Sequence, residues 1–182
     1  MRKLLFQSLV LPPLTEPAPA IDDPEVADLA ARLDATARRR LGRSLSIREV
    51  DAGSCNGCEL EIHALNNVFY DLERFGVRFV ASPRHADVLL VTGPVTKNMR
   101  EALERTYGAT PAPKWVVAVG DCAAGGGLFA ISYAVEGGAS AVLPVDLHIR
   151  GCPPTPTALL KGLLALLETG DGGTVISATT KP

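Results

Sequence analysis

Residues 50–61 read Val50-Asp51-Ala52-Gly53-Ser54-Cys55-Asn56-Gly57-Cys58-Glu59-Leu60-Glu61. A short apolar run ends in this stretch and a segment of helical periodicity leaves it, so it marks a passage from a strand into a helix. It holds two of the four cysteines in the 182-residue chain. The others are Cys122, in a glycine-rich segment, and Cys152, which precedes two prolines. The spacing is therefore C-x2-C-x63-C-x29-C.

From residue 45 onward, short apolar runs alternate with segments of helical periodicity. This pattern predicts strands at 45–50, 77–81, 88–92, 115–119 and 141–145, and helices at 56–74, 96–107 and 156–168. Strands that alternate with helices argue for a parallel sheet with right-handed crossovers. The sequence therefore predicts an α/β fold.

The chain divides into four segments by composition. Residues 1–22 form a proline-rich N-terminal arm, and 23–44 hold an N-terminal helix and a linker. The helix, expected at 23–41, has Pro24 in its first turn and an arginine run in its last turn, which suits the helix dipole. Residues 45–169 form the α/β domain, and 170–182 are expected to be a flexible tail.

The composition excludes two classes of function. A net charge of −2 provides no global basic field, so no nucleic-acid partner is expected. No apolar run approaches the roughly 18 residues that a membrane-spanning helix requires. Because 47% of the residues are hydrophobic, the excess apolar surface is expected to contact a permanent partner subunit.

The N-terminus imitates a secretory signal, with Arg2-Lys3 ahead of Leu4-Leu5-Phe6. Gln7-Ser8 interrupt this apolar run and Pro12-Pro13 break it, so we expect cytoplasmic residence. In that compartment, cysteines are metal ligands or free thiols more often than structural disulfides.

Each cysteine falls where a predicted strand passes into a helix. Cys55 and Cys58 follow the first strand, Cys122 follows the strand at 115–119, and Cys152 precedes the last helix. The strand-to-helix loops of an open parallel sheet share its carboxyl edge, where ligands bind. Four cysteines that are distant in sequence are therefore predicted to meet in space.

The neighbours of these cysteines favour an iron–sulfur cluster. Gly57 and the glycines at 125–127 allow close backbone approach and can offer N–H groups to sulfur. The helix after Cys58 points its N-terminus at the site, which favours a thiolate. Pro153 after Cys152 resembles the Cys-Pro end of ferredoxin-type runs, and four thiolates suffice for one 4Fe–4S cluster.

Other interpretations of the four cysteines remain open from the residues alone. Buried structural cysteines would not all stand at strand ends. A zinc site with four cysteine ligands, in an interaction module, is the strongest rival, although such ligands usually form two close pairs. A C-x-x-C redox dithiol would leave Cys122 and Cys152 unexplained. A flavin or nucleotide site would suit the sheet edge, but no G-x-G-x-x-G or Walker pattern follows the first strand.

Four further residues could tune the charge of the cluster or form a proton route. Glu61 lies three residues after Cys58, Arg84 precedes a strand, and His148 and Arg150 stand just ahead of Cys152. Each is also explained by an ordinary surface or structural role, and no histidine pair has zinc-ligand spacing.

At these motifs the chain resembles the small, cluster-bearing subunit family shared by NADH–quinone oxidoreductase (its PSST-type subunit) and the group 4 membrane-bound nickel–iron hydrogenases, including formate hydrogenlyase. The resemblance covers roughly residues 45–168. It is carried by the segments 53–61, 82–88, 92–99, 120–123, 132–135 and 145–154.

This resemblance implies a flavodoxin-like parallel sheet with helices on both faces and one 4Fe–4S cluster on Cys55, Cys58, Cys122 and Cys152. It also implies three kinds of partner: a large hydrogenase-like or quinone-oxidoreductase-like subunit, a ferredoxin-like iron–sulfur subunit, and membrane subunits. The chain would sit peripherally on the cytoplasmic side of the membrane and would carry no catalytic residue of its own.

The spacing of the first two cysteines distinguishes the branches of this family. Quinone-reducing relatives carry adjacent cysteines, whereas this chain has Cys55-x-x-Cys58, as hydrogenases do. The resemblance therefore implies an electron-transfer subunit of the formate hydrogenlyase or energy-converting hydrogenase type. The PSST-type subunit of an NADH–quinone oxidoreductase-like complex is the alternative.

Overall fold

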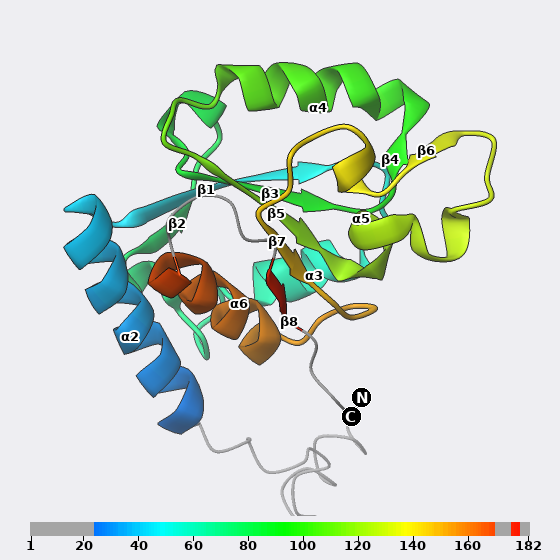
Figure 1. The fold of residues 1–182 in the computed structure, drawn as a ribbon. Coiled ribbons are helices and arrows are strands. Elements are labelled where there is room, and N and C mark those ends of the chain that lie inside the picture. The colour runs from blue at the N-terminus through cyan, green and yellow to red at the C-terminus, as the bar shows by residue number, and fades with distance from the viewer. Residues whose placement is uncertain (1–23, 170–175, 179–182) are drawn as a thin grey trace, which may run out of the picture.

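A six-stranded, all-parallel sheet forms the centre of the protein, with strand order β2-β1-β3-β5-β7-β8 (Figure 1). The structure is a computed structural model that describes residues 24–169 and 176–178. The strands are β1 (Leu45–Asp51), β2 (Val77–Phe79), β3 (Val88–Thr92), β5 (Trp115–Val119), β7 (Leu147–Ile149) and β8 (Ile176–Ala178). A separate antiparallel pair joins β4 (Val95–Thr96) to β6 (Val135–Gly137).

Helices cover both faces of the sheet, as Figure 1 shows. One face carries α2 (Pro24–Leu41), α3 (Gly57–Ala64) and α6 (Pro156–Thr169), and the other carries α4 (Lys97–Ala109). The short helix α5 (Gly120–Gly125) follows β5 directly. Four 3-10 turns complete the described elements: η1 (Leu72–Phe75), η2 (Pro83–His85), η3 (Gly127–Phe129) and η4 (Ala139–Ala141). The α/β class and the flavodoxin-like sheet are thus confirmed.

Alternating side chains of the central strands supply two aliphatic cores. On β3, Val88 and Leu90 join the core beneath α2 and α6, while Leu89 and Val91 join the core beneath α4. All five residues of β3 and of β5 are buried, as expected of strands covered on both faces. These continuous apolar runs explain why both strands have the predicted bounds, 88–92 and 115–119.

The helix predicted at 56–74 is wrong in its second half, because α3 ends at Ala64. The Asn67 side-chain oxygen accepts bonds from the backbone N–H groups of Phe69 (2.9 Å) and Tyr70 (3.0 Å). Such a turn competes with the helical hydrogen-bond pattern. Asp71 then takes a positive φ of 43°, which a continuing helix cannot include.

The strand predicted at 141–145 is also wrong. Residues 139–141 form the 3-10 turn η4, and the N–H of Leu143 still bonds the carbonyl of Ala139 at 2.9 Å. The strand that extends the sheet is β7, which begins at Leu147. Three residues with a polar His148 between two buried neighbours carry too little periodicity to be recognised in the sequence.

The remaining predicted elements lie close to the observed ones. The helices expected at 23–41, 96–107 and 156–168 correspond to α2, α4 and α6, each within two residues at either end. Within the predicted tail, residues 176–178 form β8, a strand that the sequence analysis did not predict. The arm at 1–22 and the rest of the tail lie outside the described residues.

Candidate functional site

All four cysteines lie at the carboxyl ends of parallel strands. Cys55 is in the loop after β1 and Cys58 in the first turn of α3. Cys122 is in α5, immediately after β5, and Cys152 is between β7 and α6. Because β1, β3, β5 and β7 are consecutive and parallel, these positions share one edge of the sheet. All four are free cysteines.

Hydrogen bonds hold the Cys122 and Cys152 segments together. The N–H of Asp121 donates to the carbonyl of Gly151 at 2.9 Å, and the N–H of Gly151 donates to a carboxylate oxygen of Asp121 at 3.3 Å. Arg150 lies 3.8 Å from the same carboxylate oxygen. The two cysteine loops are therefore fixed to each other by the residues that flank the cysteines.

Two glycines make room for the sulfur atoms. A Cβ at Gly120 would lie 2.6 Å from the sulfur of Cys58, and one at Gly127 would lie 2.6 Å from the sulfur of Cys122. Both glycines have positive φ, +89° and +53°, which other residues adopt rarely. The backbone and the sulfurs are thus packed so closely that a methyl group would displace one of them.

The pKa values of Cys58 and Cys122 are raised in the folded chain. Burial raises the pKa of Cys58 to about 12, and Glu59 and the other three cysteines contribute to the same shift. Burial and the charges of Cys152 and Cys55 also raise the pKa of Cys122, opposed by a hydrogen bond from the backbone of Leu128. The cysteines of three separate segments are therefore close enough to interact.

Four cysteine thiols are a donor set that suits either a zinc ion or an iron–sulfur cluster. Within residues 24–169 and 176–178, no group of three or more His, Cys, Asp or Glu side chains is arranged to hold a metal ion. The chemistry of the donor set, four thiols beside glycine backbone, is therefore compatible with both kinds of site.

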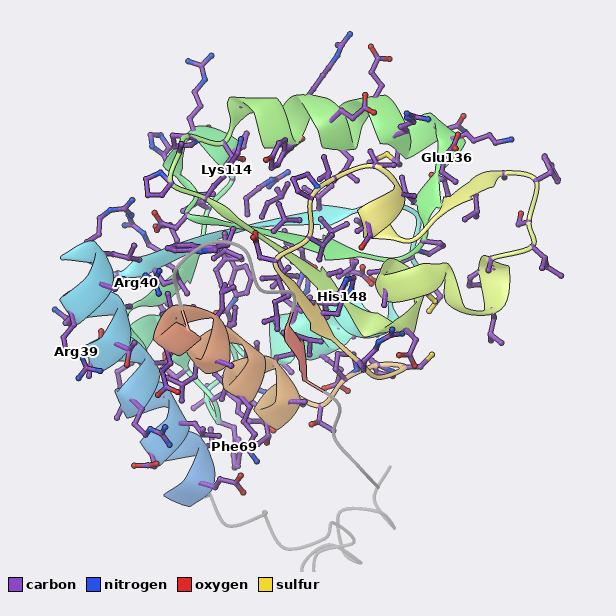
Figure 2. All side chains as sticks on the ribbon, viewed as in Figure 1. Arg39, Arg40, Phe69, Lys114, Glu136 and His148 are labelled. Atoms are coloured by element: carbon purple, nitrogen blue, oxygen red, sulfur yellow. The ribbon has the colours of Figure 1, made fainter. Side chains whose placement is uncertain are left out.

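The other predicted residues take different positions. Arg150 lies beside the cysteine loops, whereas Glu61 is half-buried on α3 and Arg84 lies in η2. His148, labelled in Figure 2, lies in β7 with its Nε2 3.3 Å from the hydroxyl of Ser140. Burial, and secondly Arg150, lower the pKa of His148.

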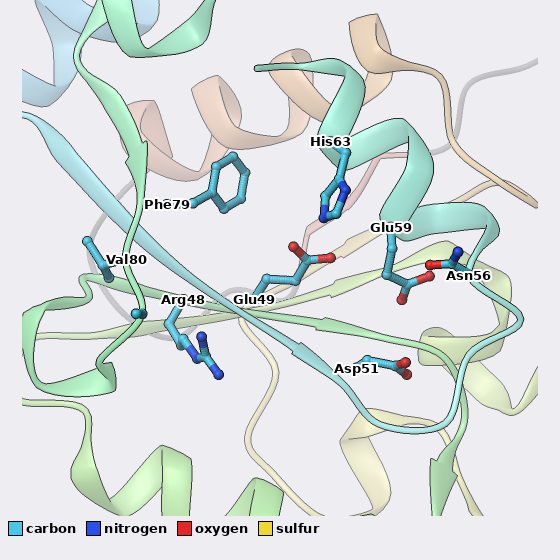
Figure 3. Close-up of a pocket in the computed structure, with 9 residues that line it drawn as sticks. Arg48, Glu49, Asp51, Asn56, Glu59, His63, Phe79 and Val80 are labelled. Carbon is cyan, nitrogen blue, oxygen red and sulfur yellow. The ribbon is translucent and has the colours of Figure 1, made fainter. Parts of the chain in front are cut away.

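The sequence analysis missed two carboxylates near the first motif. Glu49 and Glu59 face a cavity of about 440 Å³ between β1, α3 and the end of β2 (Figure 3). A signal for Glu49 was present, because in β1 it follows the buried Leu45 and Ile47 at intervals of two. It thus occupies a core-facing position with a charged side chain.

An exposed apolar segment follows Cys122. Leu128, Phe129, Ile131 and Tyr133 are all accessible, Leu128 to 87% and Ile131 to 99%. This segment, residues 127–133, begins at the glycine that contacts the sulfur of Cys122. Clustered exposed apolar side chains of this kind mark a surface that another protein covers.

The described chain is thus a parallel α/β domain with four free thiols at the carboxyl edge of its sheet. The chain belongs to the family described as NADH ubiquinone oxidoreductase, 20 Kd subunit, whose model matches residues 55–166. In the part of the chain that the structure describes, no helix is both long and apolar enough to cross a membrane.

Its relatives include subunits of hydrogenase complexes. Formate hydrogenlyase subunit 7 of Escherichia coli K12 is 44% identical over 155 residues, which are 84% of this chain and 59% of that protein. The probable membrane-bound hydrogenase subunit mbhJ of Pyrococcus furiosus is 48% identical over 70% of this chain and 77% of its own length. The chain thus spans less than two thirds of the bacterial relative.

A solved structure has the same architecture. It belongs to the membrane-bound sulfane sulfur reductase, an archaeal respiratory membrane complex. The TM-score is 0.62 with 35% sequence identity, and the match covers 77% of each chain. The last two of these proteins are accordingly subunits of membrane-bound complexes.

Proposed function

We propose that this chain binds one 4Fe–4S cluster through Cys55, Cys58, Cys122 and Cys152. It serves as an electron relay in a membrane-associated complex of the formate hydrogenlyase or energy-converting hydrogenase type. A cluster of this kind transfers single electrons at a potential set by hydrogen bonds, local charge and solvent access. The observation that carries the proposal is the gathering of four free thiols from three separate segments at one sheet edge.

The chain's own residues hold and tune the site. Gly120 and Gly127 let the backbone approach the sulfurs, and the backbone of Leu128 donates to Cys122. Arg150 contributes positive charge beside the Cys152 loop, where it also pairs with Asp121. Such neighbours of metal ligands fix the ligands and adjust their basicity.

An electron-relay subunit needs one partner that donates electrons to it and another that accepts them. The apolar segment 127–133 adjoins Cys122 and gives a large hydrogenase-like subunit a surface close to the cluster. A ferredoxin-like iron–sulfur subunit and membrane subunits complete the complex. The chain itself then lies peripherally on the cytoplasmic side of the membrane.

The test is the metal content and low-temperature EPR spectrum of the chain purified without oxygen. We expect about four irons and four sulfides per chain and a signal from one unpaired electron after reduction. Replacing any one cysteine by serine should abolish the signal, whereas Thr157→Ala in α6 should leave it intact. A sample that contains only zinc, with no EPR signal, would refute the relay and favour the zinc-stabilised module.

The family description also supports an alternative, the PSST-type subunit of an NADH–quinone oxidoreductase-like complex. Against it stand the Cys55-x-x-Cys58 spacing and the identity to hydrogenase subunits. Purification of the native complex and measurement of its turnover with protons or with a quinone distinguish the two.

A further inference from the structure

The cavity lined by Glu49 and Glu59, here called the Glu49–Glu59 pocket, lies beside the cysteine site. Its volume is about 440 Å³, and its walls come from β1, the first two turns of α3, the last residue of β2 and the two residues that follow it. Figure 3 shows the carboxylate of Glu49 between β1 and α3, with Glu59 and His63 projecting from the helix toward the same space.

The carboxylates of this pocket have unused hydrogen-bonding capacity. Glu59 is only 7% exposed, and both of its carboxylate oxygens are buried without a hydrogen-bond partner among the described residues. One carboxylate oxygen of Glu49 is also buried without a hydrogen-bond partner among the described residues. Burial raises the pKa of Glu49 to about 6. A buried carboxylate without a partner is costly, and the N-terminal turn of α3 offsets only part of that cost for Glu59.

The cations near the pocket do not neutralise it. Figure 3 shows Arg48 on the opposite side of β1 from Glu49, as strand alternation requires, and the Nε of Arg48 also lacks a partner within the described chain. Asp51 uses its carboxylate to accept the N–H groups of Gly53 and Ser54. Three carboxylates and one guanidinium line the pocket, so its formal charge is −2 with His63 neutral.

We propose that the Glu49–Glu59 pocket receives the guanidinium group of an arginine side chain from a partner subunit. A guanidinium presents several N–H donors in one plane, which allows it to bridge two carboxylates. The ring of Phe79 forms a wall of the same cavity, and a guanidinium stacks well on an aromatic face.

This inference rests on the chain's place in a multisubunit complex but not on the cluster. The first test therefore uses the isolated full chain with ethylguanidinium chloride as the probe, followed through the backbone amide signals of residues 49, 59 and 79. We expect saturable binding with a dissociation constant on the order of millimolar. Ethylammonium chloride should bind more weakly, because it cannot bridge two carboxylates in one plane.

Matched variants decide whether the carboxylates are responsible. Glu49→Gln/Glu59→Gln should weaken probe binding at least tenfold, whereas Glu73→Gln, on the exposed turn η1, should leave it unchanged. Shifts that do not saturate, or that are equal in the double variant, would overturn the proposal.

A second measurement separates a binding role from a structural one. If Glu59 awaits a partner, Glu59→Gln should raise the melting temperature of the isolated chain, by about 2–4 °C, because it removes a buried carboxylate that has no hydrogen-bond partner. The double variant should also reduce co-purification of the large hydrogenase-like subunit at least tenfold while the EPR signal of the chain persists. A lowered melting temperature of Glu59→Gln, or unchanged co-purification of the double variant, would contradict the inference. The absence of an EPR signal from the unmodified chain would instead count against the proposed electron relay.

Discussion

The two ends of the parallel strands differ in the groups that remain available for binding. At the amino ends, the buried Asp87 accepts a hydrogen bond from Arg43 at 2.9 Å and another from the N–H of Ser46 at 3.0 Å. Asp146 accepts the N–H of Val116 at 2.7 Å. Lys114, labelled in Figure 2, donates to the carbonyl of Thr110 at the end of α4 at 2.9 Å. These three side chains at the amino ends therefore have their partners within the chain.

At the carboxyl ends, Asp51 and Asp121 also accept backbone N–H groups, but other groups remain available for binding. The four cysteines form no disulfide, the oxygens of Glu59 have no hydrogen-bond partner among the described residues, and the apolar segment 127–133 is exposed. Stability is therefore built in at one end, and capacity to bind is retained at the other. Function is expected where buried polar groups lack hydrogen-bond partners or apolar side chains are exposed, and at the carboxyl edge of a parallel sheet.

The largest expected effect lies at the carboxyl end. Gly120→Ala should weaken retention of the cluster about 10–100-fold, because the new methyl group would lie 2.6 Å from the sulfur of Cys58 at a positive φ. Iron content after gel filtration measures it. Gly108→Ala, with nothing within 4 Å of the new Cβ, is the control. Equal iron contents in Gly120→Ala and the unmodified chain would mean that the site tolerates displacement of the Cys58 sulfur.

At the amino end, Asp87→Ala should lower the free energy of unfolding by about 3 kcal/mol. The change removes two hydrogen bonds from Arg43 and leaves the N–H of Ser46 buried without its partner. Urea unfolding measures the loss, with the exposed Asp28→Ala as the control. The folded fraction of this variant should still bind iron. A loss of iron without a loss of stability would contradict the assignment of stability to the amino ends and of binding to the carboxyl ends.

A smaller effect concerns the pH dependence of the isolated chain. The folded-state pKa of Glu49 is raised from 4.5 to about 6 by burial, so the folded state holds its proton more tightly than the unfolded state. Stability from this group is therefore present at low pH and decreases as pH rises through 4.5 to 6. After allowance for solvent screening the decrease is about 1 kcal/mol. Urea unfolding of the chain and of Glu49→Gln across this range should differ by that amount.

The smallest effect is expected away from both ends. Arg105 and Glu101 form an exposed ion pair along α4, so Arg105→Gln should change the free energy of unfolding by less than about 0.5 kcal/mol. The same urea measurements test it. A larger change in the free energy of unfolding would show that the Arg105 side chain stabilises the fold through more than this exposed ion pair.

Much of the scaffold could be predicted from local patterns. Strands β3 and β5 are continuous apolar runs, and α2 has its proline and its arginine-rich last turn at the expected ends. The end of α3 could not be predicted, because it depends on the turn made by Asn67. The position of β7 was missed because its three residues gain their partners only from β5 and β8.

Only part of the candidate site could be predicted from the sequence. The positions of the cysteines after strands follow from the alternation of strands and helices, which fixes the edge they share. The Glu49–Glu59 pocket could not be anticipated, since its walls belong to β1, α3 and the end of β2, which are separated in sequence.

The sequence by itself determined the parallel α/β class, the number of thiols and the strand ends on which Cys55, Cys58 and Cys122 stand, because these follow from periodicities within single segments. Tertiary structure alone decided how closely glycine backbone approaches sulfur and which carboxylates line the same open pocket. Those features depend on distances between segments far apart in the chain, and such distances are set by the packing of the whole domain.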